Sequence, residues 1–293
     1  MGFRYWIGGA ARAVSEAGRW RRGSSCCDPS PRCAGARAKA QSPMATFRVG
    51  TSGWSYASWR GRFYPAELSP RHYLEFYARY FSTTEVNYSF YHLPRPSTYE
   101  KWCAQVPDDF CFALKASRFI THVKRLHEVQ EAWEVFVSNA RSLGRRLGPL
   151  LLQFPASFHC DMARLATFLH NARPRACRSP LRLALEFRHP SWFTEETFEL
   201  LRAHDAALCI ADAPQYPRYN VVTASFVYLR FHGRQQLFAS KYTDAELTAE
   251  ANRIRRWLRD GWDVYVYFNN DALAHAVANA QTLARLVQRK IRR

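Results

Sequence analysis

The chain has 293 residues, of which 47% are hydrophobic and 23% charged, and its formal net charge is +18 at pH 7. This composition is typical of a globular protein and excludes collagen-like and low-complexity chains. No uninterrupted apolar run reaches the ~18 residues of a membrane helix, so we expect no membrane partner and a cytoplasmic location. The positive charge favours anionic partners, either small molecules or nucleic acid.

The first 43 residues differ from the rest. They hold eight basic and two acidic side chains among many Gly, Ser and Pro residues, and they have no sustained hydrophobic period. This pattern predicts a disordered N-terminal extension, or a segment upstream of a start codon at Met44. A targeting peptide is a further alternative, although the Cys-Cys and Pro clusters are atypical of one. We therefore divide the chain into an extension, residues 1–43, and one domain, residues 44–293. The eight cysteines form no C-x-x-C pair, which gives no support for a zinc or iron–sulfur site.

Eight short apolar segments of residues 44–293 predict β-strands. Each is rich in β-branched or aromatic residues and ends at a turn or a polar residue. Most are nearly continuous hydrophobic runs, as expected for a parallel sheet covered on both faces. The predicted strands are residues 47–51, 83–88, 110–114, 149–154, 181–187, 206–212, 226–232 and 263–269.

Helical patterns lie between these strands. In the last of them, apolar residues from Leu273 to Val287 form one stripe at helical spacing. Thr243 followed by Glu246 three positions later predicts a capping box. The clearest predicted helices are residues 69–81, 128–143, 161–172, 194–204, 243–259 and 273–290.

The number of strands and the length of the domain decide between two fold classes. Eight strands alternating with helices over about 250 residues are typical of a (β/α)8 TIM-type barrel. A doubly wound open sheet is the alternative, but the sequence has no dinucleotide fingerprint. We predict an α/β fold, a TIM-type barrel preceded by a disordered extension.

Polar residues gather at the predicted carboxyl ends of the strands, where barrel enzymes have their active sites. Glu85, Gln153 and Glu186 lie within apolar runs. A buried carboxylate needs a partner, which can be a structural arginine, for example Arg188 or Arg230 beside Glu186, or a ligand. The full candidate set is Trp54, Glu85, Asn87, Lys115, Gln153, Glu186, Arg188, Asp212, Arg230, His232, Arg234, Asn269, Asn270 and Asp271.

Three of these residues form the predicted catalytic group. Glu186, Asp212 and His232 come from neighbouring predicted strands, so we expect their side chains to converge. Two carboxylates and an imidazole could also bind a divalent metal that polarises a phosphoryl or carbonyl oxygen. The sequence has no signature for a nicotinamide, a flavin or a P-loop nucleotide, and no G-x-S-x-G elbow.

The cations at the strand ends predict the ligand class. Lys115, Arg188, Arg230 and Arg234 lie on or just after predicted strands, and His122 follows in a loop. Guanidinium groups match phosphate oxygens in a bidentate manner, so this set favours a phosphate-bearing ligand. Pairing with the nearby acids is the alternative.

The first loop, GTSGWSYASWRGRFYP (residues 50–65), is unusually aromatic. We expect it to fold over the barrel mouth. Phe63 and Tyr64 are predicted to pack within the loop, whereas Trp54 is predicted to face a ligand, as aromatic rings do in single-strand binders.

These motifs resemble a known family. GTSGWSYASWRGRFYP, EVNYSFYHLP, FALKASRFITH, LLQFP, LEFRHPSW, YLRFHGR and VYFNND are similar to segments of the YecE-like family, also called domain-of-unknown-function family 72. The resemblance extends from about residue 48 to residue 287. It implies a TIM-type barrel and implies no particular reaction.

The preferred hypothesis is an enzyme that acts on a phosphate-containing substrate, a nucleotide or a nucleic-acid-like molecule, at the barrel mouth, with metal-assisted phosphoester hydrolysis as a candidate reaction. The first alternative is a non-catalytic nucleic-acid-binding barrel. The second is a carbohydrate isomerase or hydrolase that uses Glu85 and Glu186 as paired carboxylates. The sequence leaves the oligomeric state open.

Overall fold

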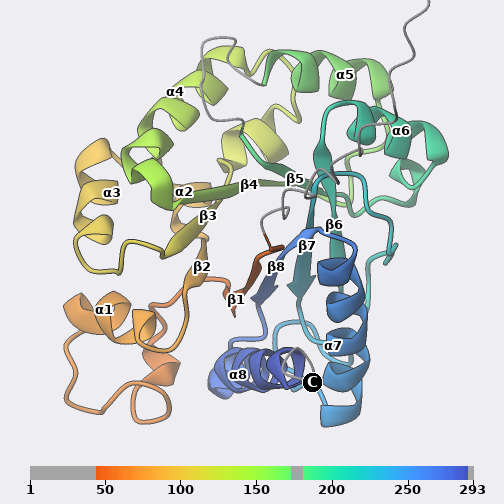
Figure 1. The fold of residues 1–293 in the computed structure, drawn as a ribbon. Helices are drawn as coiled ribbons and strands as arrows, with labels where there is room; N and C mark the ends of the chain where they lie inside the picture. The colour runs from red at the N-terminus through yellow and green to blue at the C-terminus, as the bar shows by residue number, and fades with distance from the viewer. Residues whose placement is uncertain (1–43, 173–180, 290–293) are drawn as a thin grey trace, which may run out of the picture. The chain divides into compact units, whose positions relative to one another are not determined.

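The computed structural model describes residues 44–172 and 181–289, so the predicted extension and the last residue of the predicted 273–290 helix lie outside the described residues. All eight predicted strands form (Figure 1). They are β1 (Phe47–Thr51), β2 (Thr83–Val86), β3 (Cys111–Lys115), β4 (Leu147–Gln153), β5 (Leu183–Glu186), β6 (Ala206–Asp212), β7 (Phe226–Phe231) and β8 (Asp263–Phe268).

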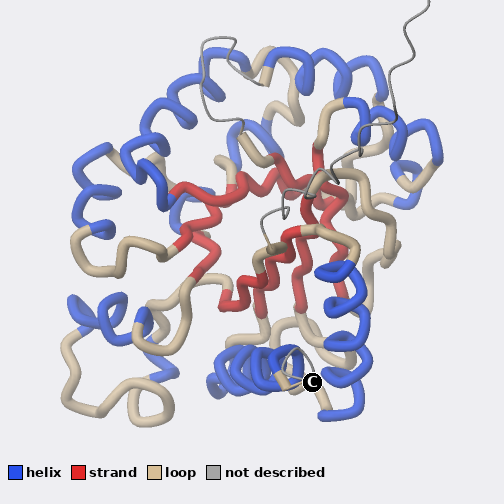
Figure 2. Tube along the Cα trace, viewed as in Figure 1, coloured by secondary structure: helices blue, strands red, loops and turns tan. Residues whose placement is uncertain are grey.

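The strands form one parallel sheet in the order β1-β8-β7-β6-β5-β4-β3-β2. Figure 2 shows the strands on the inside and helices around them. The two end strands of this order meet only at their carboxyl ends, through an isolated bridge between Ser52 and Glu85. The result is a nearly closed barrel, and the TIM-type prediction is confirmed.

The junction between β1 and β2 is held mainly by side chains. The hydroxyl of Tyr77 accepts a hydrogen bond from the backbone N–H of Thr51 at 2.9 Å and donates one to the carbonyl oxygen of Thr83 at 3.1 Å. A Cβ atom at Gly50 would lie 2.2 Å from that same carbonyl oxygen, so the close approach of the two strands requires glycine. The Tyr77 hydroxyl therefore takes the place of a ladder bond.

Helices follow most strands on the outside of the sheet (Figure 1). The connection of residues 213–225, between β6 and β7, contains no helix, whereas two helices that the sequence pattern did not predict lie between β2 and β3. The helices are α1 (Tyr73–Ala78), α2 (Tyr88–Tyr91), α3 (Pro96–Cys103), α4 (Gln130–Ala140), α5 (Met162–Asn171), α6 (Glu195–Ala203), α7 (Asp244–Arg259) and α8 (His275–Gln288).

The local signals at two helix starts had different outcomes. The capping box before α7 is confirmed: Thr243 accepts from the N–H of Glu246 at 3.3 Å, and the Glu246 carboxylate accepts from the N–H of Thr243 at 2.8 Å. The predicted stripe of α8 is wrong at its first residue. Leu273 is 55% exposed and has φ of 54°, because the helix begins only at His275.

Side chains alternate between the barrel interior and the helix layer, since successive residues of a strand face opposite sides. Towards the amino-terminal ends of the strands, small residues and aromatic rings fill the barrel interior. They form a separate cluster: Cys111, Ala113, Leu151, Ala184, Ala207, Cys209, Phe226, Tyr228, Tyr265 and Tyr267. The same alternation carries Glu85, Lys115, Gln153, Glu186 and Arg230 into the interior at the carboxyl ends.

Candidate active site at the barrel mouth

Arg230 of β7 lies at the centre of the interior and binds two carboxylates. Its Nη2 lies 2.7 Å from Oε1 of Glu85, and its Nη1 lies 2.5 Å from Oε2 of Glu186. Both acids are 0% exposed and Arg230 is 1% exposed. Ser52 and Tyr228 donate to the Glu85 carboxylate at 2.6 Å and 2.7 Å. The arrangement satisfies the buried charges with one another, as buried ion pairs require.

A second arginine completes the group. Nε of Arg188 lies 2.9 Å from Oε1 of Glu186, and its Nη1 donates to the hydroxyl of Tyr216 at 3.3 Å. Burial alone would raise the pKa of Glu186, but the guanidinium groups of Arg230 and Arg188 hold it well below its usual value. We call Glu85, Glu186, Arg188 and Arg230 the inner ion cluster. Its formal charges balance.

His232 lies beside the inner ion cluster. Its Nε2 is 3.6 Å from Oε2 of Glu186, and its Nδ1 is 3.1 Å from the side-chain nitrogen of Asn269. The imidazole is 0% exposed. Burial and the neighbouring Arg230 lower its pKa. The structure therefore brings two of the three predicted catalytic residues together.

A cavity of about 720 Å³ lies above this cluster at the carboxyl ends of the strands. We call it the mouth cavity. Its position is the one at which barrel enzymes bind their substrates. Its lining is Tyr56, Asn87, Phe90, Tyr91, Lys115, Arg118, His122, Gln153, Arg188, Arg230, Phe238, Asn269 and Asp271. Seven of the predicted site residues are in this lining, and Asp271 is its only carboxylate.

Lys115 extends from the end of β3 into the mouth cavity. Its Nζ lies 4.0 Å from the centre of the Phe90 ring. Within the part of the chain that the structure describes, its side chain has no hydrogen bond and no ion pair, because the nearest acids are bound to arginines. Burial, together with the charge of Arg230, lowers the pKa of Lys115 from its ordinary value of 10.5 to about 7.

The loop after β3 adds two further basic residues. Arg118 lines the mouth cavity and is exposed, and no ion pair to a described residue holds it. His122 lies in a π-helical turn, Phe119–Val123, where its Nδ1 lies 2.9 Å from Oγ1 of Thr121. Burial and the nearby Lys115 lower the pKa of His122 to about 4. The sequence analysis missed Arg118, although its position three residues after Lys115, in a βα loop, was a usable signal.

Asp212 does not join the other two predicted catalytic residues. It is three positions beyond Cys209, an interior residue of β6, and so faces the helix layer. There its Oδ2 pairs with Arg218 and lies 2.8 Å from Nη2 of Arg234. These residues belong to a network against α7, which we call the outer ion cluster: Asp212, Arg218, Arg234, Glu246, Glu250 and Arg253.

Two further predicted site residues lie away from the mouth cavity. The ring of Trp54 packs edge-on against Trp102, with 5.3 Å between centroids, so this residue supports the first loop instead of facing a ligand. Tyr56, two residues later, lines the cavity in its place. Asn270 is buried and donates to the carbonyl oxygen of Ser240 at 2.9 Å. The predicted packing of Tyr64 is confirmed, since its ring stacks on Tyr73 at 3.9 Å.

The donor set at the mouth is a poor match for a divalent metal. In residues 44–172 and 181–289, no three His, Cys, Asp or Glu side chains form a group that could bind one. Both oxygens of Glu186 are bound to guanidinium groups, and the positive charge of Arg230 would repel a cation placed between Glu186 and His232. The metal hypothesis depended on Asp212, which lies in the outer ion cluster.

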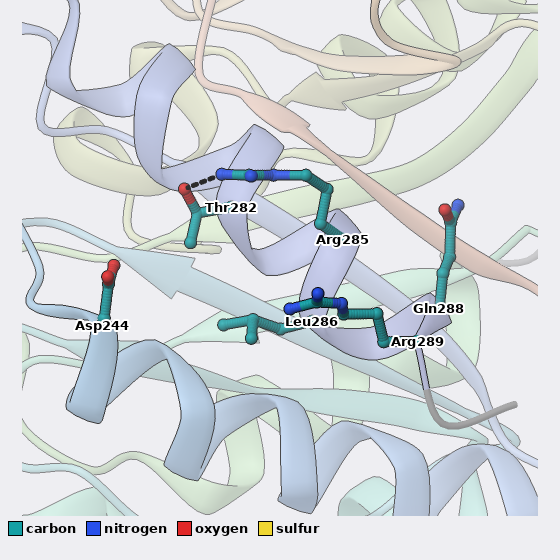
Figure 3. Close-up of a pocket in the computed structure, with 6 residues that line it drawn as sticks. All are labelled: Asp244, Thr282, Arg285, Leu286, Gln288 and Arg289. Carbon is teal, nitrogen blue, oxygen red and sulfur yellow. Dashed lines mark hydrogen bonds between the residues drawn. The ribbon is translucent and has the colours of Figure 1, made fainter.

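A second cavity lies in the helix layer. It has a volume of about 500 Å³ and is lined by Asp244 of α7 and by the last turns of α8 (Figure 3). Figure 3 shows Arg285 donating to Thr282, at 3.1 Å, within α8 itself. Its lining is partly or fully exposed and holds no buried titratable group. This cavity offers no chemistry comparable to that of the mouth cavity.

None of the described helices is both long enough and apolar enough to cross a membrane.

Comparison with known proteins gives a consistent assignment. Residues 48–293 match the sequence profile of the family described as "Protein of unknown function DUF72". The UPF0759 protein YunF of Bacillus subtilis (strain 168) is 26% identical over 270 residues, which are 82% of this chain and 94% of that protein. The UPF0759 protein YecE of Escherichia coli (strain K12) is 27% identical over 215 residues, which are 64% of this chain and 75% of that protein.

Two solved structures have the same fold. A DUF72 family protein from Thermotoga maritima MSB8 is 30% identical with a TM-score of 0.74, and the match covers 83% of this chain and 99% of that one. A DUF72 family protein from Enterococcus faecalis V583 is 21% identical with a TM-score of 0.71, over 83% of this chain and 95% of that one. Neither description names a reaction.

Proposed function

The chain belongs to the DUF72 family of proteins of unknown function, as its motifs predicted, and from the geometry of the mouth cavity we propose that it is an enzyme acting on a small phosphate-bearing substrate. The observation that carries this proposal is a charge imbalance. The inner ion cluster is neutral, so Arg118 adds a positive charge to the described lining of the cavity, and Lys115 adds a second one when it is protonated, against one carboxylate, that of Asp271.

Arg118 and Arg188 have the properties of phosphate ligands in this proposal. Arg188 lines the cavity while its Nε is fixed by Glu186, which leaves guanidinium nitrogens for a ligand. Arg118 has no ion pair with a described residue to give up on binding. Arginine forks form strong charge-assisted hydrogen bonds with phosphate oxygens. Glu186 then acts as a positioning residue, and His232 supports it from below.

The phosphate proposal can be tested by ligand-induced thermal stabilisation. Inorganic phosphate and simple phosphomonoesters should raise the Tm in a concentration-dependent manner, because a ligand that binds only the folded state stabilises it. In Arg118→Ala, the phosphate concentration needed for the same rise in Tm should be about tenfold higher or more. Arg71→Ala, at an exposed arginine outside the cavity, is the matched control and should leave it unchanged.

A turnover screen follows the binding test. Phosphorylated sugars, phosphorylated keto compounds and nucleotides would be compared with their unphosphorylated counterparts, with and without added Mg²⁺. The proposal fails if phosphate does not raise the Tm, or if Arg118→Ala and Arg71→Ala respond alike.

Nucleic-acid binding remains the second candidate, and one observation favours it. Tyr91 and Phe119 are 71% and 45% exposed near Arg118, and exposed aromatic rings beside cations suit single-stranded nucleic acid. Binding of an oligonucleotide that falls steeply with salt, and that inorganic phosphate does not displace from the mouth, would favour this candidate.

The geometry of the mouth does not favour a carbohydrate isomerase or hydrolase that uses paired carboxylates. Glu85 and Glu186 are both bound to Arg230, and neither lines the mouth cavity. A glycosidase mechanism needs two carboxyl groups that flank the substrate.

A further inference from the structure

The chain uses lysine sparingly. Only six of its 42 basic residues are lysine. One of them, Lys115, lines the mouth cavity, whereas the three permanently charged residues of the described lining, Arg118, Arg188 and Arg230, are arginines. Arginine does not lose its proton in proteins, but a buried lysine can. The mouth therefore contains one amine among guanidinium groups.

The surroundings of this amine favour its neutral form. The charged groups that act on it are Arg230 and Arg188, which disfavour the ammonium ion, and Glu85 and Glu186, which favour it. The two carboxylates are already bound to the two arginines. Nζ of Lys115 also lies over the ring of Phe90, a contact that favours the ammonium ion but supplies no negative charge. A lysine that is desolvated beside other cations is the usual form of an activated amine nucleophile.

Resting on the proposed function, we propose that Lys115 forms an imine with an aldehyde or ketone group of a phosphate-bearing substrate, while Arg118 and Arg188 bind the phosphate. The substrate class is therefore narrowed from phosphate compounds in general to phosphorylated carbonyl compounds.

The step balances without a cofactor. The lone pair of the neutral Nζ attacks the carbonyl carbon, a C–N bond forms, and the π electrons move to the oxygen. One proton leaves the nitrogen and one is added to the oxygen, which gives the neutral carbinolamine. The carbinolamine hydroxyl then takes up a second proton from solvent and leaves as water while the nitrogen lone pair forms the C=N bond. The product is a protonated imine, which can withdraw electrons from the neighbouring carbon atom.

Two other residues of the mouth cavity can accept hydrogen bonds from the reacting groups. The imidazole of His122, with its pKa lowered to about 4, is neutral at pH 7, so one ring nitrogen can act as a hydrogen-bond acceptor. Oδ1 of Asn87 is buried and has no hydrogen-bond partner among the described residues, so it is ready to accept one from a ligand hydroxyl.

The test uses two compounds, pyridoxal 5′-phosphate and pyridoxal, as probes and not as cofactors. Because free pyridoxal closes to an internal hemiacetal, the labelling rate of Lys115 by each probe is expressed relative to the rate at Lys101 with the same probe. The full chain is incubated with each at pH 7, the imine is reduced with borohydride, and the modified lysine is identified by peptide mass mapping. Pyridoxal 5′-phosphate should label Lys115 about tenfold or more faster than any other lysine, since a larger fraction of this amine is neutral. Lys115→Met should abolish this labelling, whereas Lys101→Met, on the exposed face of α3, should not.

The outcomes separate this inference from the proposed function. Fast labelling of Lys115 by pyridoxal 5′-phosphate and slow labelling by pyridoxal support both proposals. Equal labelling by the two probes supports the imine but contradicts the phosphate site. A phosphate-induced rise in Tm without preferential labelling of Lys115 supports the phosphate site and overturns the imine.

Lys115→Arg provides a variant that keeps the positive charge. It should retain stabilisation by inorganic phosphate but form no borohydride-reducible adduct at position 115. Turnover of a phosphorylated carbonyl substrate that survives in Lys115→Arg would also overturn the proposal.

Discussion

The inner and outer ion clusters use the same residue types at the same end of the barrel, yet Arg188 and Arg230 of the inner cluster line the mouth cavity and no residue of the outer cluster does. In the outer ion cluster, three arginines and three carboxylates pair with one another between the sheet and α7. In the inner ion cluster, two carboxylates pair with two arginines, and Lys115 is left without an acid. The comparison teaches that the face of the strand decides whether a charged residue stabilises the fold or remains available for a ligand.

The largest expected effect tests how deeply the inner ion cluster is buried. Arg230→Met leaves Glu85 and Glu186 without their shared cation and should lower the free energy of unfolding by about 3–5 kcal/mol. Arg234→Met, at a 45% exposed arginine of the outer ion cluster, should cost at most about 1 kcal/mol. Urea unfolding measures both. An equal loss of unfolding free energy in the two variants would contradict the view that the inner ion cluster is more deeply buried than the outer one.

The next effect concerns the pH dependence of Lys115. Its labelling rate should rise with pH and level off above an inflection near 7, because the neutral amine reacts. Glu186→Gln removes a negative charge that favours the ammonium ion, so the inflection should move below 7. Asp212→Asn, in the outer ion cluster, should leave it in place. An inflection that moves equally in both variants would contradict the separation of the two networks.

The same pKa has a consequence for stability. Lys115 releases its proton at about pH 7 in the folded chain but near its ordinary value of 10.5 when unfolded. Between these values the unfolded state holds more protons, so the contribution of this residue to the free energy of unfolding rises as pH increases. Lys115→Met should remove that rise, which can be followed by urea unfolding at several pH values.

The smallest effect concerns the helix that covers the outer ion cluster. Thr243→Ala removes the capping box of α7 and should cost about 1 kcal/mol. Phosphate binding at the mouth should not change, since Thr243 contacts Glu246 and no residue of the mouth cavity. A weaker phosphate effect on Tm in this variant would show that the two regions are coupled.

Much of the fold could be predicted from the sequence, because its signals are local. The eight apolar runs gave every strand, and the Thr243 signal gave the capping box. No helix was predicted between β6 and β7 and none is present there, whereas the short helices α2 and α3 were not predicted. Leu273 was wrongly included in a helix, because its apolar character continues the stripe while its backbone does not.

The candidate site was predictable only in part. Residue type was enough to predict that Glu85, Glu186 and Arg230 lie at the interior of the barrel. The structure has the alternative that the sequence analysis named, in which Glu186 pairs with Arg188 and Arg230. The convergence of Asp212 with Glu186 and His232 was wrong, because adjacent strand ends bring side chains together only if they face the same side. The alternation of side chains along β6 places Asp212 on the outer face only once Cys209 is known to be an interior residue, and the sequence alone does not show this. Trp54 and Tyr56 differ in the same way, since loop conformation decides which ring reaches the cavity.

The hydroxyl of Tyr77 links closure of the barrel to a helix. Because this single oxygen bridges Thr51 and Thr83, docking of α1 adds a connection between β1 and β2 to the one that the bridge between Ser52 and Glu85 provides. We predict that Tyr77→Phe leaves the amide of Thr51 without its acceptor. Its hydrogen exchange should then become fast, while amides in β6, β7 and β8 keep their protection. Unchanged exchange at Thr51 would mean that the backbone closes the cylinder unaided.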